Sequence, residues 1–323
     1  MNDSHCHFFS RRFFASLARA VAGSDPQTAE ETVLQRLGWE SPGTAEDLAD
    51  RWAAELDRHG VGRAALIASV PGDAESAARA VRRHPDRFVG FFMVDPTAPP
   101  SSPSTIQANF GEPHQRVRDG GSGAAAEAAA AIDEGGLRTI CLFPALHRYG
   151  LQDQTVRAIF EVAAARPGTV VFVHCGVLSI GVRQKLGLPN VFDPRLANPL
   201  DLLPLAAAFP SVPVIVPHFG AGFFREALMV ADSCRNVILD TSSSNAWIRY
   251  YPGLTMRAVL EQALTVVGPE RLIFGSDSSF FPRGWVREVY EKQTAALDEI
   301  GVSAAVKEQI FDRNFERLFP TTR

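Results

Sequence analysis

Several things that this 323-residue sequence has little of exclude whole classes of protein. Its cysteines are too few and too scattered for a disulfide framework, so we expect reduced, buried thiols at Cys6, Cys141, Cys175 and Cys234. It has 32 Lys and Arg against 36 Asp and Glu, and this lack of a basic surplus argues against nucleic acid or an anionic membrane as a partner. No apolar run approaches the length of about 18 residues expected of a membrane span. The first residues show neither a basic nor an apolar leader segment, and we therefore predict a soluble, cytoplasmic protein.

Eight short, β-rich apolar runs alternate with helix-sized segments along the chain. Their continuous Val, Ile, Leu and Phe residues indicate strands that are buried on both faces, as in a parallel sheet. A strand–helix unit repeated eight times predicts a single-domain (β/α)8 TIM barrel over residues 1–323. The alternative, an open doubly wound sheet, lacks its G-x-G-x-x-G sequence after the first strand. The runs occupy 2–8, 61–69, 87–94, 137–143, 169–175, 212–218, 236–241 and 271–277.

Two stretches interrupt this alternation. Residues 8–43 separate the first strand from the first helix of the repeat, which we expect at 44–59 behind a capping box at Thr44. Such a long and aromatic connection at this face of a barrel is typical of a pocket wall or a lid. Residues 96–122 are rich in Pro, Gly and Ser, and we predict a flexible insertion there.

Metal-binding residue types occur where several of these strands end. His5 and His7 are two residues apart in an extended run, so both side chains project from the same face of the strand. His174, His218 and Asp277 end the fifth, sixth and eighth runs. Since the carboxyl ends of barrel strands meet at one mouth, where active sites form, we expect these side chains to gather around one metal ion. Either His174 or His218 alone could be a buried histidine with a structural role. That interpretation does not explain why four separate strands all place metal-type side chains at the same end of the barrel.

The motifs around these residues resemble those of the amidohydrolase superfamily, in the branch that includes aminocarboxymuconate-semialdehyde decarboxylase and γ-resorcylate decarboxylase. The resemblance spans nearly the whole chain except 96–122. It is carried by Asp3-Ser4-His5-Cys6-His7, Leu142-Phe143-Pro144-Ala145-Leu146, Val173-His174-Cys175-Gly176, Pro217-His218-Phe219-Gly220, Phe274-Gly275-Ser276-Asp277, and Asn314 with Arg317-Leu318-Phe319.

This resemblance implies a site with one divalent metal, usually zinc and sometimes manganese. His5, His7, His174 and Asp277 become its ligands, while His218 becomes the acid/base beside the metal-activated water, from which Asp277 can also take a proton. Two-metal relatives use a carboxylated Lys on the fourth strand, where this chain has Cys141. A single metal is therefore expected, with Cys141 as a small buried apolar residue rather than a ligand. The resemblance also implies a homodimer.

Three readings of the function remain open at this stage. The first is a metal-dependent hydrolase that acts on an amide, lactone or related bond of a small molecule, aromatic or carboxylated. The second is a metal-dependent decarboxylase on the same barrel, which shares every ligand. The third is a catalytically silent barrel that binds a small molecule, although the complete set of expected ligands and His218 argue against it. A phosphoesterase that also opens with His-x-His would need more His and acidic ligands than the sequence offers.

The substrate is less well indicated than the metal. Phe8 and Phe9 directly follow the second metal-type histidine and are predicted to wall a flat substrate. His147 lies just past the fourth strand, and Arg249 and Arg283 fall in predicted loops at the mouth of the barrel. We predict that these residues contact the substrate, the arginines through a carboxylate.

Overall fold

The computed structural model describes residues 1–21, 29–98, 123–178, 180–242 and 247–321. Within these residues, eight strands pair in parallel, each with the next one along the chain. This order confirms the predicted TIM barrel. The predicted insertion at 96–122 lies almost entirely outside the described residues. The strands are β1 (Asp3–Phe8), β2 (Ala64–Ala68), β3 (Phe88–Met93), β4 (Thr139–Leu142), β5 (Val170–Val173), β6 (Val214–Val216), β7 (Val237–Asp240) and β8 (Leu272–Ile273).

The barrel closes between β1 and the segment that follows β8. Backbone amides of Ser4 and His7 donate to the carbonyls of Phe274 and Ser278, at 2.8 and 2.7 Å, and the Asp277 amide donates to the His5 carbonyl at 2.8 Å. Since parallel strands exchange backbone hydrogen bonds along their length, this closure sets Asp277 against the two histidines of β1.

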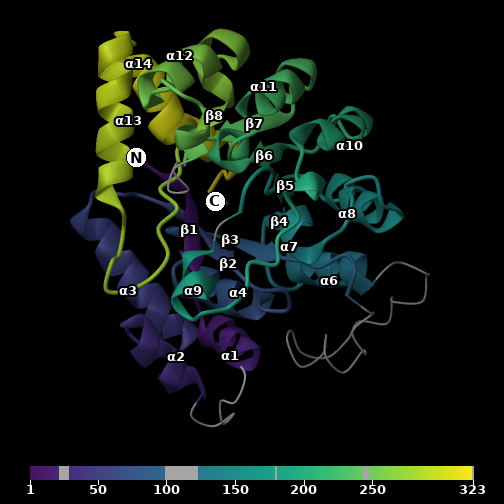
Figure 1. Cartoon of the computed structure of the whole chain (residues 1–323), viewed down its shortest axis with the longest axis vertical. Helices are drawn as coiled ribbons and strands as arrows, with labels where there is room; N and C mark the ends of the chain where they lie inside the picture. Colours follow the sequence, from purple (N-terminus) through teal and green to yellow (C-terminus); the bar gives the residue numbers. More distant parts are fainter. Residues whose placement is uncertain (22–28, 99–122, 179, 243–246, 322–323) are drawn as a thin grey trace.

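Helices surround the strands (Figure 1). The predicted capping box is confirmed at the start of α3, where the Thr44 side chain and Asp47 bond each other's backbone amides. No helix among the described residues is both long and apolar enough to span a membrane. The surrounding helices are α3 (Ala45–Arg58), α4 (Ala74–Arg83), α6 (Gly123–Asp133), α8 (Gln154–Ala164), α10 (Leu203–Ala208), α11 (Phe224–Ser233), α12 (Met256–Val267) and α13 (Arg287–Ile300). Shorter helical turns are α7 (Pro144–His147), α9 (Gly181–Lys185), η1 (Pro194–Leu196), η2 (Pro199–Leu202), η3 (Pro217–Gly220), η4 (Trp247–Tyr250), η5 (Pro269–Arg271), α14 (Ala304–Glu308), η6 (Gln309–Arg313) and α15 (Asn314–Leu318).

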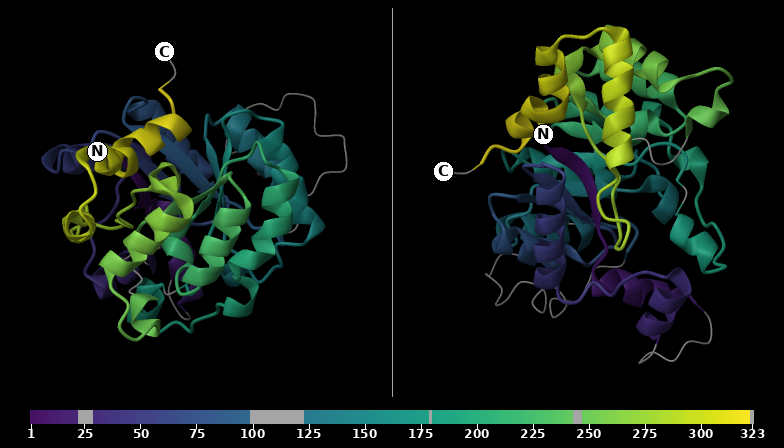
Figure 2. Two further views of the ribbon diagram at one scale, coloured as in Figure 1. Left: turned by 90° about the horizontal axis from the view of Figure 1, so that it is seen from above. Right: turned by 90° about the vertical axis from the view of Figure 1, so that its left-hand side faces the viewer.

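The apolar core has two main layers. One fills the space between the sheet and the outer helices, and the other fills the barrel interior, where strand side chains meet Phe172 at the centre. Phe315 and Phe319, from α15 and the residue after it, belong to the interior layer. They close the end of the barrel where the strands begin, which leaves the opposite end for a site. Figure 2 shows α15 and the chain termini at one end of the molecule and α1 and α2 at the other.

The connection 8–43, predicted as a long loop, contains two helices, α1 (Arg11–Ala20) and α2 (Ala29–Leu37). Their buried side chains pack with Val182 and Leu186, at α9, in a small apolar cluster separate from the barrel core. Ser10 begins α1 by accepting hydrogen bonds from the Arg12 and Phe13 amides. The described parts of the connection therefore form a pair of packed helices at the mouth of the barrel.

Candidate metal centre

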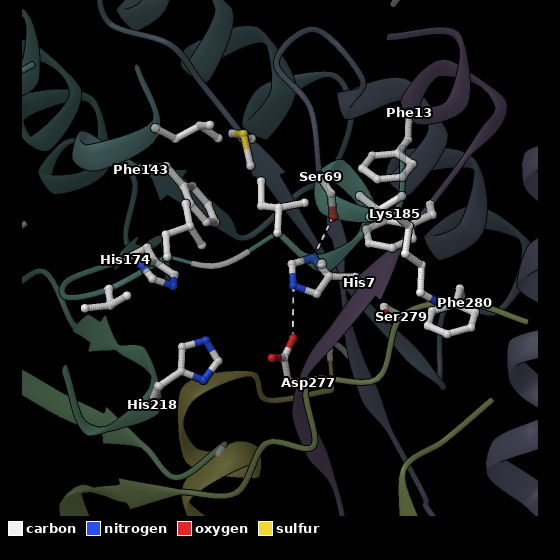
Figure 3. Close-up of a pocket in the computed structure, with 18 of the residues that line it drawn as sticks. His7, Phe13, Ser69, Phe143, His174, Lys185, His218, Asp277, Ser279 and Phe280 are labelled. Atoms are coloured by element: carbon white, nitrogen blue, oxygen red, sulfur yellow. Dashed lines mark hydrogen bonds and ion pairs between the residues drawn. The ribbon is translucent and has the colours of Figure 1, made fainter. Parts of the chain in front are cut away.

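Two histidines of β1 and the aspartate that follows β8 converge at the mouth of the barrel. His5 and His7 both project inward because side chains alternate along a strand. The Nε2 atoms of His7 and His5 lie 3.1 and 3.6 Å from Asp277 Oδ1. The three ligand atoms all lie within 4.8 Å of one another. Figure 3 shows the His7 ring pointing directly at the Asp277 carboxylate, with a dashed line joining the two.

Hydrogen bonds on the far side of each ring fix where the protons of these histidines reside. His5 Nδ1 donates to the Asp240 carboxylate at 2.6 Å. His7 Nδ1 donates to the Ser69 hydroxyl at 2.7 Å, because that hydroxyl gives its own proton to the Ile67 carbonyl. In the neutral rings both Nε2 atoms therefore present lone pairs toward the oxygen of Asp277. Three electron pairs directed at one another are repulsive unless a cation lies between them.

The charges around His5 and Asp277 agree with this requirement. Burial alone would raise the pKa of Asp277, but the imidazoles around it, His7 first and then His5 and His218, lower it far below its usual range. Burial opposes protonation of His5, yet the charge and hydrogen bond of Asp240, together with the charges of Asp277 and Asp3, outweigh it and raise the pKa of His5 to about 8. At neutral pH a proton on His5 thus supplies positive charge to a pair of buried carboxylates. A divalent ion would take the place of that proton.

His218 lies beside His5 at the end of β6, with ring centroids 4.8 Å apart. Its Nδ1 donates to the Ser242 carbonyl at 3.1 Å, so Nε2 carries the lone pair of the neutral ring. Burial lowers the pKa of His218. His218 and Asp277 both adopt left-handed backbone, with φ of 56° and 57°. Such residues cost roughly 1–3 kcal/mol each and cluster at functional sites.

His174 ends β5 next to His218, with ring centroids 5.3 Å apart. It lies outside the group of atoms that converge within 4.8 Å. Both of its ring nitrogens are buried and have no hydrogen-bond partner among the described residues. An unpaired polar atom in a protein interior costs about 1–3 kcal/mol. The structure therefore brings together three of the four predicted ligands and leaves the fourth beside them without a partner.

A cavity of about 540 Å³ opens from these residues. That volume lies within the range of roughly 300–1,000 Å³ typical of small-molecule sites. His174 and His218 lie on one side of it, and Lys185 and Phe280 lie on the other (Figure 3). The lining aromatic residues are Phe9, Phe13, Trp39, Phe143, Trp247, Tyr250 and Phe280. The lining cations are Lys185, Arg249 and Arg283, and Asp277 is the one carboxylate among the described lining residues.

The amidohydrolase family profile matches residues 3–321. The chain belongs to the amidohydrolase family. No curated protein matches its sequence. Among solved structures it is similar to 5-carboxyvanillate decarboxylase from Sphingomonas paucimobilis, with 16% identity, a TM-score of 0.60 and coverage of 99% of this chain and 98% of that one.

Two further solved structures have the same fold. 4-Oxalomesaconate hydratase from Rhodopseudomonas palustris is 16% identical, with a TM-score of 0.58 and coverage of 99% of this chain and 96% of that one. A zinc-bound amidohydrolase from Burkholderia multivorans is 16% identical, with a TM-score of 0.54 and 99% coverage of both chains. Because these barrels carry out different reactions, the reaction of this amidohydrolase has to be argued from its site.

One glycine of the family motifs has a clear spatial reason in this amidohydrolase. Gly176, after His174, has a φ of 86°, and a Cβ there would lie 2.0 Å from the Gly220 carbonyl oxygen. A side chain at this position would push apart the loops that follow β5 and β6. The glycine thus holds the His174 and His218 loops in contact.

The predicted substrate contacts of the amidohydrolase divide into two groups. Phe9, Arg249 and Arg283 line the cavity as expected. Phe8 does not, because it alternates with His7 along β1 and packs into the core layer outside the barrel, where it is fully buried. His147 is also outside the cavity lining, because α7 carries it past the mouth and presents Leu146 there instead.

Residues that the motifs did not single out complete the site. Asp240 supports His5, Ser69 supports His7, and Lys185 lines the cavity from α9. Asp240 could have been found, because it ends an apolar strand run just as Asp277 does. Cys141 faces the barrel interior, where burial raises its thiol pKa well above the usual value. It packs in the apolar cluster of the barrel interior and is not among the ligand atoms that converge in the described residues.

Proposed function

We propose that this amidohydrolase is a metal-dependent hydrolase that cleaves an amide, lactone or related bond of a small anionic molecule. The observation that carries the proposal is the convergence of ligand atoms of His5, His7 and Asp277 within 4.8 Å of one another, beside the unprotonated Nε2 of His218. The unpartnered nitrogens of His174 fit the fourth ligand. These four residues would hold one divalent ion, with zinc the first candidate and manganese the second. Such an ion would act as a Lewis acid and would lower the pKa of water so that hydroxide, the nucleophile, is available near neutral pH.

The state of His218 favours hydrolysis over decarboxylation. Hydrolysis needs a base first, to take a proton from the attacking water, and then an acid for the leaving group. The neutral His218, pinned through Nδ1 to the Ser242 carbonyl, offers a lone pair at Nε2 and suits that order. Decarboxylation needs a proton donor for carbon at the outset. His218 has no proton on Nε2, and the low pKa of Asp277 leaves it ionised.

Metal content and reaction products test this proposal together. Protein purified without a His tag or added metal should contain about one zinc or manganese ion per chain by elemental analysis. His5→Ala/His7→Ala should contain none. Loaded protein should then hydrolyse members of a panel of lactones, cyclic amides and aromatic carboxylates without releasing CO₂. Wild-type protein that neither contains nor binds a divalent metal would contradict the proposal, and CO₂ as the product would replace it with the decarboxylase.

The charge of the cavity supports an anionic substrate. Lys185, Arg249 and Arg283 line it without a carboxylate partner among the described residues. Arg283 donates to the Ser279 hydroxyl at 2.7 Å and to the Asp277 carbonyl at 3.2 Å, which holds it near the metal centre. Lys185 Nζ lies 5.8 and 5.9 Å from the Trp39 and Phe280 rings. A flat molecule packed on this aromatic wall would have its anionic group within reach of these cations.

Removing either cation should weaken substrate binding more than it slows the chemical step. We expect Arg283→Met and Lys185→Met each to raise KM by about 10- to 100-fold, the cost of a hydrogen bond to a charged group. Lys292→Met, which removes an exposed lysine of α13 that pairs with Glu288, is the matched control. Steady-state kinetics on the hydrolysed compound separate KM from kcat. An unchanged KM in both cavity variants would refute an anion at this end of the cavity.

A further inference from the structure

Asp240 is a buried carboxylate to which neither the family motifs nor the convergent ligand group assigns a role. It ends β7 and is fully buried. Both of its oxygens are engaged, since Oδ2 accepts from His5 Nδ1 at 2.6 Å and Oδ1 accepts from the Ser242 amide at 2.7 Å. Nδ1 and Nε2 lie on different edges of the imidazole ring, so Asp240 holds the edge of His5 opposite the one that faces Asp277.

A missing side chain makes room for this contact. A Cβ on Gly275 would lie 2.7 Å from Asp240 Oδ1 and 2.7 Å from the Cβ of His5. Real Cβ atoms do not approach other atoms so closely. Asp240 and His5 therefore meet in the space that Gly275 leaves open, which gives the glycine before Ser276 and Asp277 a reason in packing rather than in backbone freedom.

The same short segment also contacts the second histidine of the site. The Ser242 hydroxyl lies 2.8 Å from His218 Nδ1 and 3.3 Å from His5 Nδ1. Residues 240–242 thus contact the Nδ1 edge of His5, which is in the candidate ligand group, and the Nδ1 edge of His218, which lies beside that group. Both rings consequently present Nε2 to the cavity.

We propose that Asp240 is a positioning residue that fixes the tautomer and the direction of the His5 ring for metal binding. Gly275 is needed because any side chain there would occupy the space in which Asp240 and His5 meet. The inference rests on the proposed metal centre but concerns residues outside its ligand set. A carboxylate behind a ligating histidine holds the ring in place and strengthens it as a ligand. An asparagine at 240 has one acceptor oxygen for two donors, the His5 ring and the Ser242 amide, so one of the two contacts would be lost.

Zinc titration of the metal-free protein against a chromophoric chelator tests this role without an activity assay. We expect Asp240→Asn to raise the zinc Kd by about 10- to 100-fold, the usual cost of losing such a partner, and Gly275→Ala to raise it as well. The matched control for Asp240→Asn is Asp232→Asn, at an exposed aspartate. The matched control for Gly275→Ala is Gly150→Ala, because a Cβ added there would have no atom closer than 3.9 Å. Circular dichroism reports whether each variant is folded.

A measurement on the unmodified chain makes the test independent of how well the variants fold. Nitrogen-15 spectra of labelled histidine in the zinc-loaded wild type should show His5 protonated at Nδ1, with a strongly deshielded proton. A folded Asp240→Asn that binds zinc as tightly as wild type would overturn the positioning role while the metal centre stands. A His5 ring protonated at Nε2 in the zinc-loaded wild type would overturn both the positioning role and His5 as a ligand. A wild-type chain that binds no zinc or manganese would overturn the metal centre and this inference with it.

Discussion

Asp277→Asn will purify with almost no bound metal, whereas the wild type carries about one ion per chain. The change removes the one carboxylate that faces both histidines, and with it the charged ligand of the candidate metal centre. Asparagine is among the few residues that tolerate the left-handed backbone at this position, so the barrel should keep its fold. Elemental analysis and thermal unfolding measure the two effects separately.

The matched control for this variant is Asp86→Asn, at an exposed aspartate far from the mouth of the barrel. It should retain its metal. Full metal content in a folded Asp277→Asn would show that the convergence of His5, His7 and Asp277 serves the fold and not a metal.

His218→Asn will retain its metal and lose turnover, with kcat lower by about 10²- to 10⁴-fold, the usual contribution of a general acid/base. Asparagine keeps a donor for the Ser242 carbonyl and accepts the left-handed conformation, but it has no basic nitrogen to present to the cavity. His84→Asn is the control, because His84 caps α4 and pairs with Asp50 at the surface. Stopped-time assays of hydrolysis, with metal content measured on the same samples, distinguish loss of the base from loss of the ion.

Wild-type turnover in a metal-loaded His218→Asn would remove the acid/base role. The reaction would then depend on the ion and on Asp277 alone.

The fold was predictable because barrel strands buried on both faces appear in the sequence as short, continuous apolar runs. The pairing of His5 with His7 was predictable for a similar reason, since a strand repeats every two residues. The same rule places Phe8 on the other face, and applying it there would have excluded Phe8 from the cavity. At strand ends the rule no longer holds, because the left-handed residues at 218 and 277 redirect the chain. The gathering of His174 and His218 at one mouth was predicted, but the place of His174 outside the convergent ligand group was not.

Contacts between distant segments were the hardest part to predict. Lys185 lies in a five-residue helix without a regular apolar pattern, and its position depends on how Val182 and Leu186 pack against α1 and α2. Tertiary packing of this kind leaves no local signal. Asp240 did leave one, at the end of the seventh strand, but its partner His5 is 235 positions away.

The pair of packed helices α1 and α2 has a small core of its own, and it carries Phe13 while its flanks carry Phe9 and Trp39. The histidines and Asp277 are held by the barrel strands and the segments directly after them. The aromatic residues that this segment contributes to the cavity are therefore held by a different part of the fold from the candidate ligands. A laboratory library confined to Phe9, Phe13 and Trp39 would therefore vary the shape of the cavity without changing His5, His7 or Asp277.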